Sequence, residues 1–503
     1  MIHRHPEHAA AERYDVIVVG GGMVGAALSL EAARRGLRPL LLERSDFGGA
    51  TTSNSLRIVH GGLRYLQSLD VRRSIESSLE RSRLLRDFPD LVRPLACLMP
   101  LYSRGLRRPW LFGAALALDG CLSVGRNRGL SSDHRLRAGR VLDARETAAL
   151  FPAVYPRGLR GGGLWSDAWI ADPQRLVMEI LRWAAVLGAT ALNYVECSRL
   201  LAPGRGVEGV CAIDRETGLV HEYRAPLVIN CAGPWCRLVA ERLDRDLPRL
   251  FRPSLALNVL LDRPAVSTAA VAVSAPSRGS RTYFLVPHQG RILAGTHHVR
   301  GAGPGSPPEL EAHVDGFLQA LTEALPGLSP RREEVLRVYA GWVPAAEEGG
   351  EEPARSPVIH DHGRRNGPVG LVSVSAVKLT TARRLAEKAL RAALNGRGKA
   401  LSPPGPAPRP SPAEYPGLRH ALAGAAGDEA PAAALAECLE RLAREESALH
   451  LDDMLLRRVD VEATPGELRR LASAACRALG WSDERSRREQ ERLDECLSCP
   501  LRV

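Results

Sequence analysis

The chain has 503 residues, of which 45% are hydrophobic and 25% are charged, the composition of an ordinary globular protein. Collagen-like, low-complexity and disordered classes are excluded, and the length predicts two or three domains. Lys and Arg number 68 against 57 Asp and Glu, so the formal net charge is +11, and the positive residues are spread along the chain. This charge is compatible with an anionic substrate or an anionic membrane surface. Aromatic residues make up only 5%, which disfavours nucleic-acid binding.

The ten cysteines are scattered, which indicates reduced thiols in the cytoplasm rather than a disulfide framework. Cys496 and Cys499 form a lone C-x-x-C pair, which by itself predicts neither a zinc site nor a redox protein. No stretch reaches the roughly 20 apolar residues that cross a bilayer. The first residues are polar and lack the apolar core of a signal peptide, so residues 1–13 are predicted to be a disordered N-terminus.

A β-α-β unit is predicted at the start of the chain, with strands at 14–19 and 37–43 and a helix at 26–35. Its right-handed crossover implies a parallel, doubly wound sheet.

Between the first strand and the helix lies the motif Gly20-x-Gly22-x-x-Gly25. The first glycine suits a tight turn, the second lets the backbone approach a pyrophosphate, and the third lets helix and strand pack closely. The helix N-terminus would then face the phosphates. Glu43, at the end of the second strand, suits an acid that binds a ribose hydroxyl pair. These residues predict a bound dinucleotide and do not distinguish FAD from NAD.

Apolar segments far downstream have the character of the first strands, so we expect the nucleotide-binding domain to be discontinuous. Short β-type runs alternate with turns in the middle of the chain and predict an antiparallel sheet. The fold class expected is α/β plus α+β. The predicted boundaries are 14–250 with 336–398 for the nucleotide-binding domain, 251–335 for the main part of a substrate domain, 399–416 for a proline-rich linker and 417–503 for a C-terminal helical domain.

The segment 107–128 has an apolar centre, Trp110 to Val124, with arginines at both ends. Two interpretations stay open. It is either an interfacial helix, with its apolar body in lipid and its arginines at the headgroups, or a surface helix packed on its own domain.

Residues 50–66, Ala-Thr-Thr-Ser-Asn-Ser-Leu-Arg-Ile-Val-His-Gly-Gly-Leu-Arg-Tyr-Leu, resemble the signature S-S-K-L-I-H-G-G-x-R-Y-L of FAD-dependent glycerol-3-phosphate dehydrogenases. The resemblance continues in the same order to about residue 490. The further segments are Trp165-Ser-Asp-Ala-Trp169, Asn230-Cys-Ala-Gly-Pro-Trp235, Gly295-Thr-His-His298, Lys378-Leu-Thr-Thr381 and Leu451-Asp-Asp-Met-Leu-Leu-Arg-Arg458. It implies a Rossmann-type FAD-binding domain of discontinuous segments. No histidine or cysteine stands out as an attachment site, so we expect FAD to be bound non-covalently.

In that family, hydride passes from C2 of sn-glycerol 3-phosphate to flavin N5, and electrons pass on to quinone or another acceptor. The resemblance implies that His60 is the base that takes the hydroxyl proton. It implies that Lys378 is an electrostatic partner of the flavin. The cofactor contacts that motif and resemblance imply are Gly20, Gly22, Gly25, Glu43, Thr51, Thr52, Ser53, Gly61, Gly62, Gly233, Lys378, Leu379 and Thr380.

The resemblance breaks at positions expected to face the substrate. Val343 replaces an arginine that would grip the substrate anion, and His360 stands at the second arginine position. Leu56 replaces a serine. The expected substrate residues are therefore Arg57, His60, His297, His298 and His360. No metal site is expected, because no carboxylate or cysteine stands at ligand spacing from the two adjacent histidines.

Three functions stay open. The first is a glycerol-3-phosphate dehydrogenase with a rearranged anion site. The second is an FAD-dependent dehydrogenase or oxidase for a different hydroxy or amino compound, and the third is a flavin-binding protein without turnover. The resemblance also implies peripheral contact of the 107–128 segment with an anionic membrane, at the inner face of the cell membrane. The sequence indicates no oligomeric state.

Overall fold

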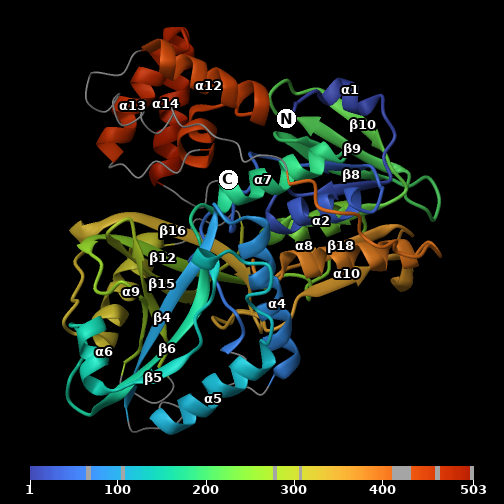
Figure 1. Cartoon of the computed structure of the whole chain (residues 1–503). Helices are drawn as coiled ribbons and strands as arrows, with labels where there is room; N and C mark the ends of the chain where they lie inside the picture. Colours follow the sequence, from blue (N-terminus) through green and yellow to red (C-terminus); the bar gives the residue numbers. More distant parts are fainter. Residues whose placement is uncertain are drawn as a thin grey trace. The chain divides into compact units, whose positions relative to one another are not determined.

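The computed structural model of the protein describes residues 1–63, 70–102, 108–275, 280–304, 309–409, 432–458 and 465–498 (Figure 1). The chain divides into two compact units. The first unit comprises residues 1–53, 172–253 and 342–503, and the second comprises residues 54–171 and 254–341.

A six-stranded sheet in the order β17-β18-β11-β1-β2-β7 forms the centre of the first unit. Its inner strands pair in parallel, β2 with β1, β1 with β11 and β11 with β18, which confirms the predicted doubly wound sheet. Pieces of chain far apart in sequence supply these strands, so the predicted discontinuity is also observed. The strands are β1 (Val16–Val19), β2 (Pro39–Leu42), β7 (Thr190–Leu192), β11 (Val228–Asn230), β17 (Val358–Asp361) and β18 (Leu371–Ser375).

Both faces of this sheet are covered, and every residue of β1 and β2 is buried. Three neighbouring helices, α2 (Met23–Ala33), α7 (Pro173–Val186) and α10 (Ala382–Asn395), cover one face (Figure 1). A three-stranded antiparallel sheet packs on the other face through a shared apolar core. Its strands are β8 (Val195–Leu201), β9 (Gly209–Asp214) and β10 (Val220–Arg224). The smaller helices of this unit are α1 (Pro6–Ala10), η3 (Gly233–Trp235), α8 (Cys236–Leu243) and η5 (Gly363–Arg365).

The N-terminal residues 1–13 are ordered, so the predicted disorder is wrong. Ile2 is 2% exposed and exchanges hydrogen bonds with the backbone of Glu445 and the hydroxyl of Ser447. Arg4 donates to the carboxylate of Asp214. The segment is polar in composition, but these few long-range contacts outweigh the chain entropy that would leave it free.

The C-terminal helices have an apolar core of their own and also belong to the first unit. They are α12 (Ala432–Glu446), the π-helical turn η6 (Asp453–Arg458), α13 (Pro465–Ala478) and α14 (Asp483–Ser498). The fully buried guanidinium of Arg458 binds the carboxylate of Asp46 with two hydrogen bonds of 2.5 and 2.8 Å. The helical character predicted for 417–503 is thus observed where the structure describes it. Within the predicted linker, the backbone of Gly405 exchanges hydrogen bonds with Arg34, and residues from 410 lie outside the described part.

The second unit is built on a nine-stranded sheet, in the order β16-β12-β15-β14-β13-β4-β6-β3 with β5 beside β6. The predicted boundaries differ here, because residues 54–171 belong to this sheet and not to the nucleotide-binding domain. The sheet is also mixed, since β13 pairs with β4 in parallel. Its strands are β3 (Ile58–Val59), β4 (Val92–Tyr102), β5 (Arg140–Leu142), β6 (Leu159–Ile170), β12 (Pro253–Pro264), β13 (Ala270–Val273), β14 (Tyr283–His288), β15 (Arg291–Arg300) and β16 (Val335–Pro344).

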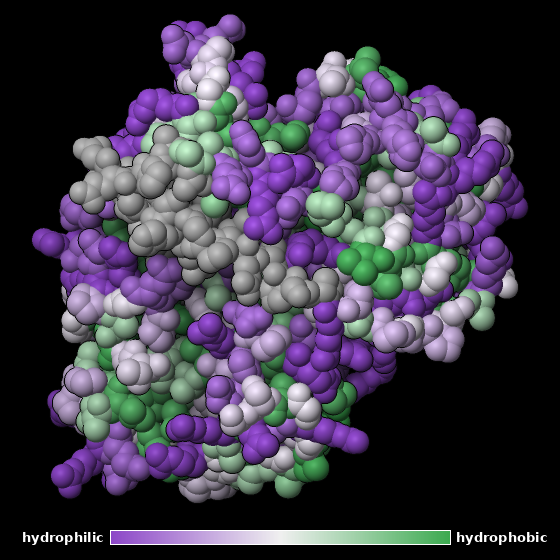
Figure 2. Space-filling model, turned by 45° about the horizontal axis from the view of Figure 1, so that its top comes forward, coloured by the Kyte–Doolittle hydropathy of each residue, from purple (hydrophilic) through white to green (hydrophobic). Residues whose placement is uncertain are grey.

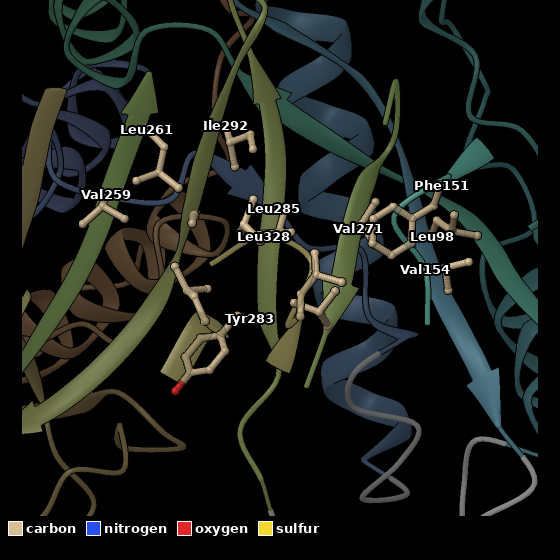
Figure 3. Packing of buried hydrophobic residues seen from close by; sticks show 14 of the residues in the cluster. Leu98, Phe151, Val154, Val259, Leu261, Val271, Tyr283, Leu285, Ile292 and Leu328 are labelled. Atoms are coloured by element: carbon tan, nitrogen blue, oxygen red, sulfur yellow. The ribbon is translucent and has the colours of Figure 1, made fainter. Parts of the chain in front are cut away.

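One face of the nine-stranded sheet packs against α9 (Leu310–Ala324) through an apolar cluster that includes Leu261, Leu285 and Ile292 (Figure 3). A second apolar cluster on the other face includes Cys97 and Leu293. The other helices in the described part of this unit are α4 (Val71–Asp87), α5 (Pro109–Leu122), α6 (Ala144–Leu150), η2 (Ser132–His134) and η4 (Arg332–Glu334).

The predicted helix within 107–128 is observed as α5. Phe112 and Leu116 pack into the second cluster, whereas Trp110 is 69% exposed and Leu118 is 42% exposed. None of the described helices is long and apolar enough to cross a bilayer. On the face that Figure 2 shows, hydrophilic residues predominate and hydrophobic ones form small groups.

Candidate functional site

The glycine motif forms the turn between β1 and α2. Gly20 has φ +104°, a conformation that side chains with a Cβ rarely adopt. A Cβ on Gly25 would lie 1.9 Å from the carbonyl oxygen of Gly20, so only glycine fits there. Gly22 stands at the N-cap of α2 and brings no side chain over the helix end. The turn therefore leaves the helix N-terminus open to an anionic group, as a bound pyrophosphate requires.

Glu43 follows β2 directly, and its carboxylate faces this turn. It accepts hydrogen bonds from the backbone N–H of Gly21 at 2.6 Å and of Ser45 at 2.9 Å. Burial raises the pKa of Glu43, and the two N–H donors partly oppose this rise. Each carboxylate oxygen accepts one of these bonds and keeps capacity for another donor, such as a ribose hydroxyl.

The hydroxyl residues at 51–53 hold the adjoining loop. Thr52 Oγ1 accepts from the N–H of Met23, in the first turn of α2, at 3.2 Å. Thr51 donates to the carbonyl of Trp342 at 2.8 Å, and Ser53 donates to the carbonyl of Ala50 at 2.8 Å. Of the three, Thr52 is therefore the one joined to the glycine turn.

Two further predicted cofactor residues follow neighbouring strands of the same sheet. Gly233, just beyond β11, has φ +54°, and among the described residues nothing lies within 4 Å of where its Cβ would be. Lys378 lies in the loop between β18 and α10, followed by Leu379 and the buried Thr380. Parallel strands present their carboxyl ends at one edge, so the loops after β1, β2, β11 and β18 meet at the same edge. The glycine turn, the acid and the open loop fit a dinucleotide such as FAD.

In the second unit, His60 is paired with a buried carboxylate. Its Nδ1 lies 3.3 Å from Oδ2 of Asp167, and the side chains are 28% and 4% exposed. Asp167 also accepts from the backbone N–H of Gly61 at 2.6 Å, from Arg81 at 2.8 Å and from Trp165 Nε1 at 3.2 Å. Burial by itself would raise the pKa of Asp167. The donors from His60, Arg81 and Gly61 outweigh burial and lower that pKa to about 2.

This arrangement fixes the tautomer of His60. A carboxylate only accepts, so the hydrogen of the neutral imidazole lies on Nδ1 and the lone pair lies on Nε2. The ring also packs against Phe284, with centroids 5.7 Å apart. The ring of His60 is thereby oriented, with Nε2 as its hydrogen-bond acceptor.

Asp167 was not among the predicted site residues. The segment Trp165-Ser-Asp-Ala-Trp169 resembled the family, but local sequence assigns no role to an acid inside β6. The one available signal was a carboxylate in a strand whose neighbours are mostly apolar, since such a charge needs partners.

Gly61 and Gly62 were predicted to let the backbone approach the flavin. The structure shows a further reason for glycine at both positions, which is packing against α4. A Cβ on Gly61 would lie 1.6 Å from Arg81 Nη1, and a Cβ on Gly62 would lie 2.6 Å from the carbonyl of Ser74. Gly61 therefore leaves room for Arg81 to reach Asp167, and Gly62 leaves room for Ser74 of α4.

Two of the predicted substrate residues have structural roles in the second unit. Arg57 is 4% exposed, and its guanidinium donates to the carbonyl of Ala171 at 2.7 Å and lies 3.3 Å from His288 Nε2. His297 stacks on Phe317 of α9 at 5.1 Å, on the face of the sheet opposite to Phe284 and His60. In the conformation seen, both side chains are engaged in these contacts within the second unit, and their role at the substrate stays a prediction.

The other two predicted substrate residues lie in different units. His298 follows His297 on β15, so strand alternation directs its side chain to the opposite face from His297. His360 lies on β17, in edge-to-face contact with His362 at 4.7 Å. Burial lowers the pKa of His360, and the neighbouring His362 lowers it further.

No group of three or more metal-ligating side chains lies close together in the described parts of the chain. The Cys496 thiol lies 3.6 Å from a carboxylate oxygen of Asp452, and Cys499 lies outside the described residues.

Comparisons with known proteins identify the family of this chain. The family described as FAD dependent oxidoreductase (DAO) matches residues 15–391. Glycerol-3-phosphate dehydrogenase 1 of Mycobacterium tuberculosis is 32% identical, over 92% of this chain and 94% of that protein. The aerobic glycerol-3-phosphate dehydrogenase of Staphylococcus aureus is 28% identical, over 75% of this chain and 66% of that protein. The fold is that of the glycerol-3-phosphate dehydrogenase from Bacillus halodurans solved with FAD, with a TM-score of 0.72, 21% identity and coverage of 99% and 98%.

Proposed function

Because the chain belongs to the DAO family of FAD-dependent oxidoreductases, we propose that it oxidises the C2 hydroxyl of sn-glycerol 3-phosphate. The observation that carries the proposal is the His60–Asp167 pair, which holds a proton acceptor in one tautomer. The similarity to dehydrogenases named for this substrate supports the choice of substrate.

FAD, when bound, supplies the acceptor for the hydride that leaves the substrate carbon. The chain supplies the rest of the chemistry. The glycine turn and Glu43 bind the nucleotide half of the cofactor, and His60 Nε2 takes the hydroxyl proton as the substrate is oxidised. Asp167 stabilises the charge that His60 gains, and Arg81 keeps Asp167 ionised. Lys378 is the proposed positive partner of the flavin.

A different hydroxy or amino substrate is the second candidate. Val343 and His360 stand where the resemblance predicts arginines, and Arg57 and His297 are engaged elsewhere. The intact His60–Asp167 pair speaks against a flavin-binding protein without turnover.

Anaerobic flavin bleaching tests the proposal. Purified holoenzyme is mixed with about millimolar sn-glycerol 3-phosphate without oxygen, at the upper end of usual enzyme affinities. Loss of the visible flavin band supports the proposal. No loss with this substrate, while dithionite still reduces the flavin, overturns it, and bleaching by other alcohols or amines then supports the second candidate. Glycerol serves as the uncharged control.

We also infer that the second unit contacts an anionic membrane. A quinone in that membrane would accept the electrons from the reduced flavin. Val71, Ile75 and Leu79 recur every four residues on α4, so they lie on one face, and they are 41%, 36% and 64% exposed. The neighbouring helix α5 adds the exposed Trp110 and Leu118. α4 is rich in arginine, and Arg108 and Arg126 flank α5. Exposed apolar residues close to arginines are typical of interfacial helices.

Vesicle flotation tests this contact. The wild-type protein should float with vesicles that contain an anionic lipid, and Leu79→Asp should float several-fold less. Leu219→Asp is the matched control, because Leu219 is 50% exposed on the first unit. Equal flotation of all three proteins would contradict the assignment.

A further inference from the structure

A pocket of about 390 Å³ opens in the first unit where the loop after β16 meets the ends of β17 and β18. Arg249, Arg252 and Arg355 line it, together with Ser356, and its walls are alanine, proline, valine and leucine side chains. We call it the basic pocket. Its volume lies in the range of small-molecule sites.

The three arginines of the basic pocket lack ion-pair partners within the described residues. Arg249 and Arg355 are exposed at its mouth, and Arg252 is half-buried. Arg252 donates through Nη1 to the carbonyl of Ala346 at 3.2 Å, while its buried Nε has no hydrogen-bond partner in the described structure. A buried donor without an acceptor is unfavourable, and an anionic ligand in the pocket would supply the acceptor that Arg252 Nε lacks.

Neighbouring arginines on the same stretch of chain behave differently. Arg237 binds Asp246 with two hydrogen bonds of 2.6 and 2.8 Å, and Arg245 binds Asp244 at 2.8 Å. Carboxylates are thus available nearby, yet they pair with arginines outside the pocket. Within residues 237–252, the described arginines without an ion pair are the two that line the pocket, Arg249 and Arg252.

The backbone fixes the pocket wall on both sides. The N–H of Ala345 donates to the carbonyl of Arg252 at 2.7 Å, and the N–H of Ala354 donates to the carbonyl of Pro344 at 2.7 Å. These two bonds anchor the backbone beside Arg252 and Arg355. A site held by such a backbone needs little ordering when it binds a ligand.

We propose that the basic pocket binds a phosphate-type oxyanion. Each guanidinium offers a rigid fork of donors that matches phosphate oxygens, and the apolar walls strengthen charge-assisted hydrogen bonds. The glutamates in the 347–352 loop are not among the residues that line the pocket. The anion is either the phosphate of the substrate or free inorganic phosphate.

The place of the pocket favours the substrate's phosphate. Ser375 lines the pocket and lies at the carboxyl end of β18. It stands three residues before Lys378, whose loop lies at the sheet edge where the cofactor is expected to bind. Pro344, another lining residue, directly follows Val343. Assigning the substrate's phosphate to this pocket rests on the proposed function, whereas binding of phosphate itself does not.

The experiment compares the holoenzyme with Arg252→Ala/Arg355→Ala and with the control Arg199→Ala. Arg199 is also an exposed arginine of the first unit and lies outside the pocket. Calorimetric titration with inorganic phosphate at constant ionic strength measures binding without turnover. Steady-state kinetics with sn-glycerol 3-phosphate measures KM and kcat, and the flavin spectrum reports whether each variant keeps FAD.

We expect phosphate to bind the wild type and Arg199→Ala equally, and the double variant roughly tenfold or more weakly. A matching rise in KM with little change in kcat would identify the substrate's phosphate as the ligand. Weaker phosphate binding with an unchanged KM would support the site with free phosphate as its ligand. Absence of phosphate binding in the wild type, or equal binding in the double variant, would overturn the proposal. If the double variant loses FAD, Arg355→Gln alone decides between these outcomes, because Arg355 is exposed.

Discussion

Replacing Asp167 by Asn should impair both activity and stability, because the change keeps the shape of the side chain and removes its charge. In the wild-type protein, four donors converge on the carboxylate, from His60, Gly61, Arg81 and Trp165. The Asn amide turns one acceptor into a donor, so at least one of these groups loses its partner. Arg81, whose side chain is 3% exposed, is then left without its counter-charge.

The size of the effect follows from the contacts. The pKa of Asp167 falls from 3.8 to about 2. This difference corresponds to about 2 kcal/mol in favour of the charged carboxylate. Breaking a buried ion pair from one side typically destabilises by about 3–5 kcal/mol. The two figures describe overlapping interactions, so we expect Asp167→Asn to lower the free energy of unfolding by about 2–5 kcal/mol. Loss of an oriented base should slow flavin reduction about a hundredfold or more.

Anaerobic stopped-flow measures flavin reduction by the substrate, and urea unfolding at neutral pH measures stability. Asp262→Asn is the matched control in the same unit, because Asp262 is 56% exposed and pairs with Arg291 at the surface. It should change stability by less than about 1 kcal/mol. Wild-type reduction rates in Asp167→Asn would refute the role assigned to the pair, even if stability falls.

Three further predictions concern the first unit. Gly25→Ala should abolish FAD retention, since its Cβ would lie 1.9 Å from a carbonyl oxygen, whereas Gly120→Ala, with open space around it, should keep a normal ratio of flavin to protein absorbance. Arg458→Met should lower the urea midpoint by an amount equivalent to about 3–5 kcal/mol and speed FAD release, because it leaves Asp46 buried and unpaired; unchanged values would contradict this. Burial lowers the pKa of His450, but its two glutamate partners raise it to about 9. The resulting stabilisation, about 3 kcal/mol, should be complete below pH 6.5 and lost as pH rises through 9, and His450→Gln should remove this pH dependence of urea unfolding.

Local patterns predicted the elements of the first unit well. One stretch of sequence, residues 14–43, contains all the signals for the cofactor-binding turn. They are the β-branched run before Gly20, the glycine spacing and the acid Glu43. The structure confirms β1, α2 and β2 in these places.

Long-range pairing explains what was missed. Strand β4 belongs to the second unit because Cys97 and Leu98 pair with Ala270 and Val271, and no nearby residue indicates such a partner. Asp167 was missed for the same reason, since three of its four donors, from His60, Gly61 and Arg81, come from distant segments of the chain. The N-terminus was predicted to be disordered because its polar composition hides a few buried residues, Ile2, Pro6 and Ala9.

The ion pair between Asp46 and Arg458 joins residues 412 positions apart, and this separation constrains the order of events during synthesis. At about 5–20 residues per second, a ribosome needs roughly 20–80 seconds to add the partner of Asp46. Throughout this interval Asp46, in the loop after β2, has no counter-charge. For the first part of it, the sheet also lacks β11, which pairs with β1, and for most of it the sheet lacks β18, which pairs with β11. The six-stranded sheet is complete once β18 has been synthesised, but Asp46 stays without its buried partner until η6 emerges. A messenger truncated just before codon 458 should therefore yield a product that is less stable and releases FAD faster than the full-length protein, as expected for Arg458→Met.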